Sequence, residues 1–423
     1  MRLPGPGPSD FRQLREEGRF YVDKTAWIAE LLLRPEQVVL LPRPRRFGKT
    51  LNLSALRYFL EICDEDRRPL FEGLAIASAG PEVLEHQARH PVVSLNLKDI
   101  GLPDLDGCIE ALHGRIANVY GAHRTLLVGG TLSPEDRATF ERLLSCTASH
   151  VELRTSLQNL TRWLHAQHGE RCVLLIDEYD APIEAGFAHG YYDPIVDVLR
   201  DLLGGGLKDN PHLFRGVLTG VRRVAKESLF SGLNNVVVLS LLADPFRTSF
   251  GFTEDEVRTV LEAAGHAERM DEVRRWYNGY VFGSAIVYNP WSVLSFAQQP
   301  ELGCLPHWVH TGSDDVLRAQ VLTLPYVMVD ELRDLLTDKV LTKEVDPHLT
   351  LRDLDREKGA VVATLAEHHG PVRAAAFSPD GKRVFVAGND LSAHLFDAAT
   401  GALVLTVKGH LGRVDAAAFS PDG

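Results

Sequence analysis

The stretch that decides the fold is Val38-Val39-Leu40-Leu41-Pro42-Arg43-Pro44-Arg45-Arg46-Phe47-Gly48-Lys49-Thr50-Leu51. Its four consecutive aliphatic residues predict a buried strand, and the apolar pattern after Thr50 predicts a helix that extends to Ile62. A basic loop ending in Gly-Lys-Thr lies between them. This order of strand, loop and helix predicts an anion site, because N–H groups at a helix start point outward and the helix dipole favours negative charge there.

The loop residues have separate expected roles on a nucleotide. Gly48 lets the backbone approach closely, Lys49 reaches the β- and γ-phosphates, and the Thr50 hydroxyl ligates Mg²⁺. The loop departs from the common pattern G-x-x-x-x-G-K-[ST] because Arg43 replaces its first glycine. Arg45 and Arg46 can touch phosphate, extend into solvent or pair with acidic residues elsewhere. The predicted nucleotide-binding set is Arg43, Arg45, Arg46, Phe47, Gly48, Lys49, Thr50 and Leu51.

A second stretch supplies acidic residues at the end of another aliphatic run, Cys172-Val-Leu-Leu-Ile176-Asp177-Glu178-Tyr179-Asp180. Ligands bind at the carboxyl ends of strands in open α/β sheets, so this pattern is typical of a Walker B motif. We expect Asp177 to hold Mg²⁺ together with Thr50, and Glu178 to orient or deprotonate the attacking water. Asp180 either supports the metal site or caps the next turn.

A third buried run, Phe214 to Thr219, ends in a hydroxyl and is followed by Arg222 and Arg223. Thr219 is in a position to sense the γ-phosphate, and Arg222 to stabilise charge in the transition state. The alternative is a turn with solvated arginines. The predicted catalytic set is therefore Lys49, Glu178, Thr219 and Arg222.

The whole pattern predicts an α/β fold with a parallel sheet. Short apolar runs at 38–41, 92–97, 173–176, 214–219 and 236–241 are separated by long helical segments. The spacer 101–170 is helical in pattern and is expected to form an insertion or cap. Residues 251–355 predict a helical subdomain that begins at the N-cap Thr253. For its aromatic cluster, residues 276–291, two roles are open: the core of the subdomain or stacking on adenine. Residues 21–25 either cover the nucleotide or have a plain packing role in the core.

The composition excludes several classes of protein. The chain has 423 residues, of which 45% are hydrophobic and 24% charged, with a formal net charge of −12. This balance argues against disorder and against a surface built to coat nucleic acid. Five scattered cysteines and the lack of a long apolar stretch predict a soluble cytoplasmic protein.

The C-terminal part contains a repeat. Residues 370–381 recur as 412–423, 42 residues further on, and both copies end in Ala-Ala-Ala-Phe-Ser-Pro-Asp-Gly. This period resembles that of WD-repeat proteins, with Leu395-Phe396-Asp397 where their blades carry Trp-Asp. We expect an all-β partial propeller blade that binds a protein partner. Because the sequence stops inside the second repeat, we expect a truncated gene product or the front of a longer propeller.

Residues 11–355 resemble the bacterial AAA-ATPase-like family. The resemblance rests on Phe20-Tyr-Val-Asp-Lys-Thr25, Arg43-Pro-Arg-Arg-Phe-Gly-Lys-Thr50, Leu175-Ile-Asp-Glu-Tyr-Asp180, Leu218-Thr-Gly220, Lys226 to Asn235, Phe250-Gly-Phe-Thr253, Trp276-Tyr-Asn-Gly-Tyr280 and Tyr288-Asn-Pro-Trp-Ser292. It implies a P-loop NTPase with ATP as the nucleotide, the Thr219 strand between those of Lys49 and Asp177, and a helical lid. In that family the loop with Arg43 is the usual Walker A variant. The nuclease domain of many relatives is not expected here.

These observations predict three parts: an NTPase core (1–250), a helical lid subdomain (251–355) and a WD-repeat segment (356–423). The first functional hypothesis is an ATPase that uses Mg²⁺ and whose turnover drives a conformational switch linked to the repeats. The alternative is a nucleotide-gated interaction scaffold with negligible turnover. The sequence leaves the oligomeric state open.

Overall fold

The structure is a computed structural model that describes residues 5–221, 235–305, 307, 372–378, 382–388, 393–398, 400 and 402–407. The chain divides into two compact units, Met1–Leu351 and Arg352–Gly423.

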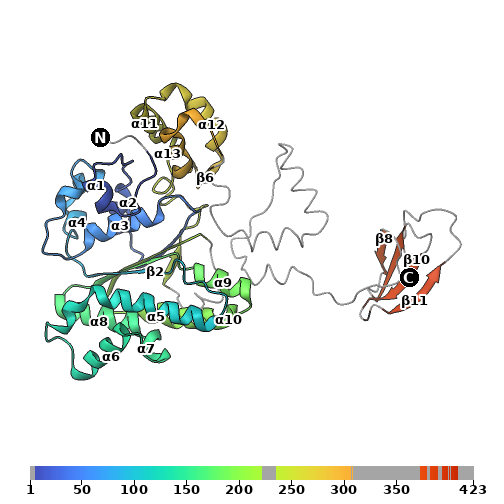
Figure 1. Ribbon diagram of the computed structural model, residues 1–423, viewed down its shortest axis with the longest axis horizontal. Helices are drawn as coiled ribbons and strands as arrows, with labels where there is room; N and C mark the ends of the chain where they lie inside the picture. The colour runs from blue at the N-terminus through green and yellow to red at the C-terminus, as the bar shows by residue number, and fades with distance from the viewer. Residues whose placement is uncertain are drawn as a thin grey trace. The chain divides into compact units, whose positions relative to one another are not determined.

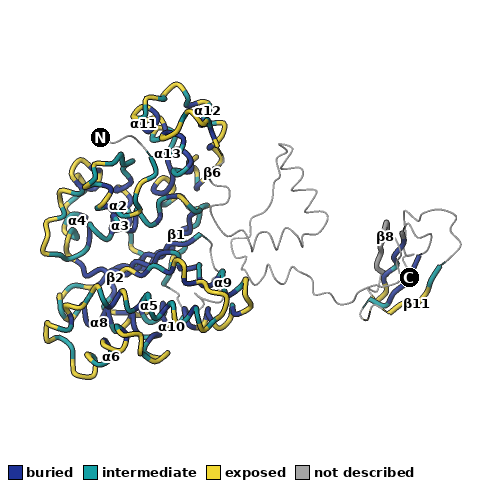
Figure 2. The backbone as a smooth tube through the Cα atoms, viewed as in Figure 1, coloured by how far each residue is buried: buried dark blue, intermediate teal, exposed yellow. Residues whose placement is uncertain are grey.

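The first unit is built on a five-stranded parallel sheet with the order β2-β3-β4-β1-β5. All five predicted apolar runs form strands, and the strand of Thr219 lies between those of the loop and of Asp177, as the resemblance implies. Every residue of β1 and β3 is buried, which explains their unbroken aliphatic sequences (Figure 2). The strands are β1 (Val38–Pro42), β2 (Val92–Asn96), β3 (Cys172–Asp177), β4 (Leu213–Gly220) and β5 (Val236–Val238).

Helices cover both faces of this sheet and make three layers (Figure 1). Helices α2 (Ala26–Leu33) and α3 (Lys49–Leu60) pack against one face, where Val39 and Leu41 join their apolar cluster. The predicted helical spacer supplies α5 (Leu105–Ala122) and α8 (Ser156–His168) on the other face, beside α10 (Tyr192–Leu207). The remaining helices of the core are α1 (Phe11–Glu16), α4 (Pro81–Leu84), α6 (Pro134–Leu144), α7 (His150–Arg154) and α9 (Ala181–His189), with 3-10 turns at Arg68–Phe71, Ala75–Ser78 and Arg124–Leu127.

Residues 251–305 and 307, the described part of the predicted lid, have a separate apolar core. As predicted, Thr253 caps a helix, because its side chain accepts from the Glu256 N–H while the Glu256 carboxylate accepts from the Thr253 N–H. Tyr277 and Tyr288 are buried in this core, and an unpredicted hairpin joins the second and third helices. The elements are α11 (Glu254–Ala264), α12 (Met270–Tyr277), β6 (Tyr280–Phe282), β7 (Ala285–Val287) and α13 (Pro290–Gln298), with 3-10 turns at Ala267–Arg269 and Pro300–Leu302.

The second unit contains one antiparallel sheet with the order β11-β10-β9-β8. Leu395-Phe396-Asp397 lies in β10, and Phe396 is buried with Val384 and Val386. This sheet confirms the predicted all-β partial blade; the second copy of the repeat, 412–423, lies outside the described residues. The strands are β8 (Val372–Phe377), β9 (Arg383–Gly388), β10 (Ala393–Asp397) and β11 (Leu403–Val407).

A pair of glycine substitutions tests the packing of the parallel sheet. A Cβ on Gly216, in β4, would lie 2.7 Å from Leu207 Cδ2 and 3.2 Å from both Cγ atoms of Val38. We expect Gly216→Ala to lower the free energy of unfolding by about 1–3 kcal/mol, because it overpacks the core. The control is Gly204→Ala in α10, where nothing lies within 4 Å of an added Cβ; it should be neutral or stabilise by up to about 1 kcal/mol. Urea unfolding followed by circular dichroism measures both, and equal stabilities would contradict the predicted layer packing.

Candidate nucleotide-binding site

The predicted phosphate loop joins β1 to the first turn of α3. Gly48 is the N-cap residue of α3 and has φ 79°, in the left-handed region that favours glycine. Lys49 is only 5% exposed, and its ammonium group donates to the carbonyl oxygens of Arg43 (3.2 Å) and Pro44 (3.3 Å). The same ammonium group lies 3.6 Å from Glu178 Oε1. The loop therefore holds its lysine at a helix N-terminus, within reach of the predicted acidic residue.

The carboxylate of Asp177, at the end of β3, joins side chains from three other elements. Its Oδ2 accepts from Thr50 Oγ1 (2.7 Å) and Asn96 Nδ2 (3.3 Å), and its Oδ1 accepts from Thr219 Oγ1 (2.5 Å). Asp177 is 5% exposed and Thr219 is fully buried. The structure thus brings together Thr50 and Asp177, the two residues predicted to flank a metal ion.

Glu178 lies in an unusual backbone conformation, with φ 53° in the left-handed region. Its side chain is 25% exposed and reaches the cavity described below. Burial raises the pKa of the Glu178 carboxyl above its usual value, and the nearby Asp177 and Asp180 act in the same direction, whereas Lys49 and Arg45 oppose them. The pKa of such a carboxyl is closer to neutral pH than the pKa of an exposed glutamate, as a general base requires.

The three arginines of the loop have different surroundings. Arg43, predicted to bind nucleotide, is fully buried, and its guanidinium donates to the carbonyl oxygens of Pro42 (2.9 Å), Leu239 (2.8 Å) and Phe246 (3.4 Å). Burial lowers the pKa of Arg43 to about 10, so that it remains charged at neutral pH. Its guanidinium lies 5.3 Å from the ring centroid of Phe250 and 5.6 Å from that of Phe282, and Arg43 is not among the residues that line the cavity described below.

Arg45 and Arg46 stay beside the cavity. Arg45 pairs with Glu184 at 3.6 Å, which is one of the alternatives that the sequence left open. The Arg46 guanidinium lies over the indole ring of Trp291, with Cζ 3.9 Å from the ring centroid. Phe47 is buried against Tyr280 and Phe282, with ring centroids 4.9 and 5.3 Å apart.

A cavity of about 640 Å³, within the size range of ligand sites, opens over the loop. Of the predicted site residues, it is lined by Arg45, Arg46, Phe47, Gly48, Lys49, Thr50, Leu51 and Glu178. Thr219 and Asp177 lie behind this lining, and Arg222 lies outside the described residues. The sequence interpretation missed Asn96 and Lys98, although polar residues at the end of an apolar run indicate the functional edge of a parallel sheet.

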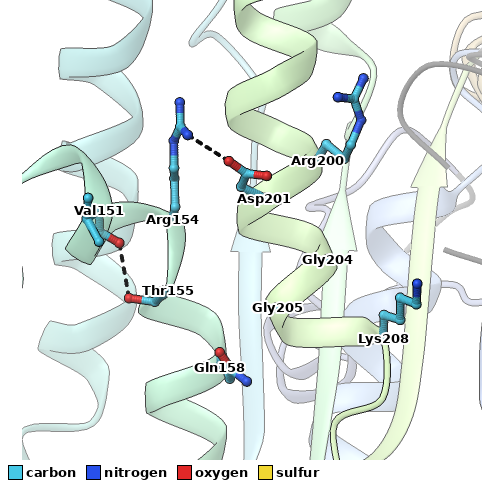
Figure 3. A pocket seen from close by; sticks show the side chains of 9 residues that line it. All are labelled: Val151, Arg154, Thr155, Gln158, Arg200, Asp201, Gly204, Gly205 and Lys208. Carbon is cyan, nitrogen blue, oxygen red and sulfur yellow. Dashed lines mark hydrogen bonds and ion pairs between the residues drawn. The ribbon is translucent and has the colours of Figure 1, made fainter. Parts of the chain in front are cut away.

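A second cavity, of about 490 Å³, lies between the segment 151–158 and α10 (Figure 3). Arg154 forms an ion pair there with Asp201 (2.7 Å), and Lys208 borders it. It shares no residue with the cavity over the loop and contains none of the predicted site residues.

The five-stranded parallel sheet with helices on both faces is that of a P-loop-like α/β protein. A family model described as "Predicted AAA-ATPase" matches residues 6–230, and a second, "WD domain, G-beta repeat", matches residues 359–397. The chain belongs to the predicted AAA-ATPase family, and its C-terminal part carries a WD repeat.

One similar protein is described as "Uncharacterized protein in vnfD 5'region" of Azotobacter chroococcum mcd 1. It is 32% identical over 313 residues, which cover 74% of this chain and 54% of the relative. The chain therefore spans about half the length of that relative. In the described ranges, every helix is too short or too polar to cross a membrane.

Two matched arginine variants separate structural from ligand-binding roles in the loop. We expect Arg43→Lys to lower the free energy of unfolding by about 1–3 kcal/mol, because the single nitrogen of a lysine cannot replace the two guanidinium nitrogens that reach these buried carbonyl groups. Arg45→Lys should change it by less than about 0.5 kcal/mol, because its partly exposed ion pair contributes little. Denaturant unfolding without nucleotide distinguishes them, and equal stabilities would refute the structural role of Arg43.

The environment of Glu178 predicts a dependence of stability on pH. Its pKa is higher in the folded than in the unfolded chain, so the folded state binds more protons between the two values and stability falls as pH rises through this window. Glu178→Gln removes this contribution. The variant should be more stable than wild type at neutral pH, and the difference should vanish below pH of about 4. Unfolding measured across pH tests this, and a wild type that is more stable at neutral pH would contradict it.

Proposed function

We propose that this chain binds ATP on the loop 43–51 and hydrolyses it with the help of Mg²⁺. The observation that carries this proposal is the 2.7 Å hydrogen bond between Thr50 and Asp177, which are 127 residues apart in sequence. The two residues meet at the carboxyl edge of a parallel sheet, beside a cavity of nucleotide size. Membership of the family supports a nucleotide-binding NTPase, and ATP is the nucleotide that the family resemblance implies.

The donor set fits Mg²⁺, which prefers oxygen ligands and is usually held by one or two carboxylates together with substrate phosphates. Thr50 and Asp177 would hold the ion. The hydrogen bonds from Asn96 and Thr219 keep the Asp177 carboxylate in place. When bound, Mg²⁺ would neutralise charge on the β- and γ-phosphates.

The remaining roles follow from the surroundings of each side chain. Lys49 would donate to the phosphates, which are stronger acceptors than the carbonyl groups that it contacts in the structure. Glu178 would orient or deprotonate the attacking water, and its raised pKa favours that role. Thr219 would act through Asp177 as a positioning residue. For Arg222, two positions beyond β4, we propose stabilisation of transition-state charge.

The WD repeat suggests protein interaction, and we propose that turnover in the first unit changes how the repeats hold a cytoplasmic protein partner. In the alternative function, ATP is a switch ligand for the same partner and turnover is negligible. Tight ATP binding by the wild type without phosphate release would favour this alternative.

Three variants of the full chain test the proposal. Lys49→Ala should lower ATP hydrolysis by about 100-fold or more, because it removes a preorganised donor to the phosphates. Glu178→Gln should retain ATP binding and slow hydrolysis by about 100- to 10,000-fold, the usual contribution of a general base. The control is Lys208→Ala, a lysine of the second cavity, which should leave both unchanged. The measurements are equilibrium ATP binding and phosphate release with Mg²⁺.

The outcomes separate the proposals. If wild type, Lys49→Ala and Glu178→Gln hydrolyse ATP at the same rate, this site is not the catalytic one. If the wild type neither binds nor hydrolyses ATP, the proposed function is wrong.

A further inference from the structure

The side chains that line the cavity over the loop include two sets of different chemistry, which we call its polar half and its apolar half. The half beside α3 carries the polar and charged groups of Arg45, Lys49, Thr50 and Glu178. The other half is lined by apolar and aromatic side chains from two distant parts of the sequence, before the first strand and in the lid: Phe20, Val22, Phe252, Pro290, Trp291 and Leu294. A ligand that fills the cavity would therefore contact both charged and apolar side chains.

Trp291 is the residue of the apolar half that contacts the loop directly. It lies on the first turn of α13, is partly exposed, and carries the Arg46 guanidinium 3.9 Å from its ring centroid. The guanidinium is a planar, delocalised group. The indole face thus accepts a flat group at the border between the two halves, and a nucleobase is a flat group of similar stacking chemistry.

The other aromatic residues of the cluster are engaged elsewhere. The Tyr277 hydroxyl contacts the backbone of Leu305, and the Tyr288 hydroxyl donates to Glu254, so both rings belong to the lid core. Tyr280 packs on Phe47. Trp276 is 49% exposed and is not among the residues that line the cavity. Of the cluster, Trp291 is therefore the aromatic residue at the cavity, whereas the tyrosines pack elsewhere and Trp276 is largely exposed.

We propose that the indole of Trp291 is the stacking surface for the nucleobase, and that the base exchanges there with the Arg46 guanidinium, which turns to the phosphates. This inference rests on the proposed nucleotide site and assigns its apolar half. A guanidinium–phosphate pair is stronger than a partly exposed cation–π contact, so the exchange is favourable for Arg46. The base then stacks on the indole face that Arg46 has left.

A comparison of two ligands separates the contribution of the base to binding from that of the phosphates. Binding of ATP and of inorganic tripolyphosphate, both with Mg²⁺, is measured by calorimetry on the full chain. Tripolyphosphate has three linked phosphate groups, as ATP does, but no base. We expect wild type to bind ATP more tightly than tripolyphosphate. Trp291→Leu should weaken ATP binding by about 5- to 150-fold, the usual effect of removing one base–aromatic stack, and leave tripolyphosphate binding unchanged.

Two further variants control for folding and for loss of a tryptophan. Trp291→Phe keeps an aromatic face and should restore most of the ATP affinity. Trp276→Leu removes an exposed tryptophan of the same lid and should bind both ligands as wild type does. ATP should also quench indole fluorescence in wild type and in Trp276→Leu, and this quenching should be absent in Trp291→Phe.

The results distinguish failure of this inference from failure of the proposed function. If wild type binds neither ligand, the nucleotide site itself is wrong. If it binds tripolyphosphate as tightly as ATP, the apolar half holds no base and the inference is overturned. Unchanged ATP affinity in Trp291→Leu overturns it too. If Trp291→Leu weakens both ligands equally, Trp291→Phe decides: nearly wild-type ATP affinity supports stacking, and equal loss for both ligands refutes it.

Discussion

The buried carboxylate of Asp177 is the constraint on which the rest of the first unit depends. A charge that is 5% exposed is tolerated only when hydrogen bonds replace the lost water, and Asp177 accepts them from Thr50, Thr219 and Asn96. These donors come from α3, β4 and β2, so one side chain of β3 ties four elements together at the same edge of the sheet. The geometry proposed to hold an ion also determines how the strand ends lie relative to the loop.

The unusual loop sequence is explained by contacts with the lid side of the unit. Arg43 donates to carbonyl groups of residues 239–246, Phe47 packs on the β6–β7 hairpin, and Arg46 covers Trp291 of α13. Gly251 shows how close this packing is, because its φ is 86° and an added Cβ would lie 3.0 Å from the Phe47 ring. At the position that is a glycine in the common pattern, the arginine side chain links the loop to residues 239–246.

The sequence predicted those features whose physical signal is local. Unbroken aliphatic runs mark strands that are buried on both faces, and Gly-Lys-Thr at a helix start and two acids after a strand mark the functional edge. It could not predict that the Arg43 guanidinium is buried against backbone carbonyl groups, because the sequence does not show in which direction a loop arginine points. Asn96 was missed because a single amide at a strand end becomes informative only after the sheet order brings it to Asp177. The hairpin was missed because its strands have three residues each.

Asp177 and Glu178 show how adjacent carboxylates acquire different chemistry. Asp177 ends a strand, and its carboxylate is held in place by hydrogen bonds from the hydroxyl groups of Thr50 and Thr219. At Glu178 the backbone enters the left-handed region, which costs about 1–3 kcal/mol and directs the side chain to the cavity. Burial there, near two other carboxylates, raises its pKa, and Lys49 offsets only part of that effect. Pairs of carboxyl groups whose surroundings differ in this way divide the work of charge binding and proton transfer. A change of one backbone conformation between neighbouring residues is therefore sufficient to give the two acids the separate roles that we propose.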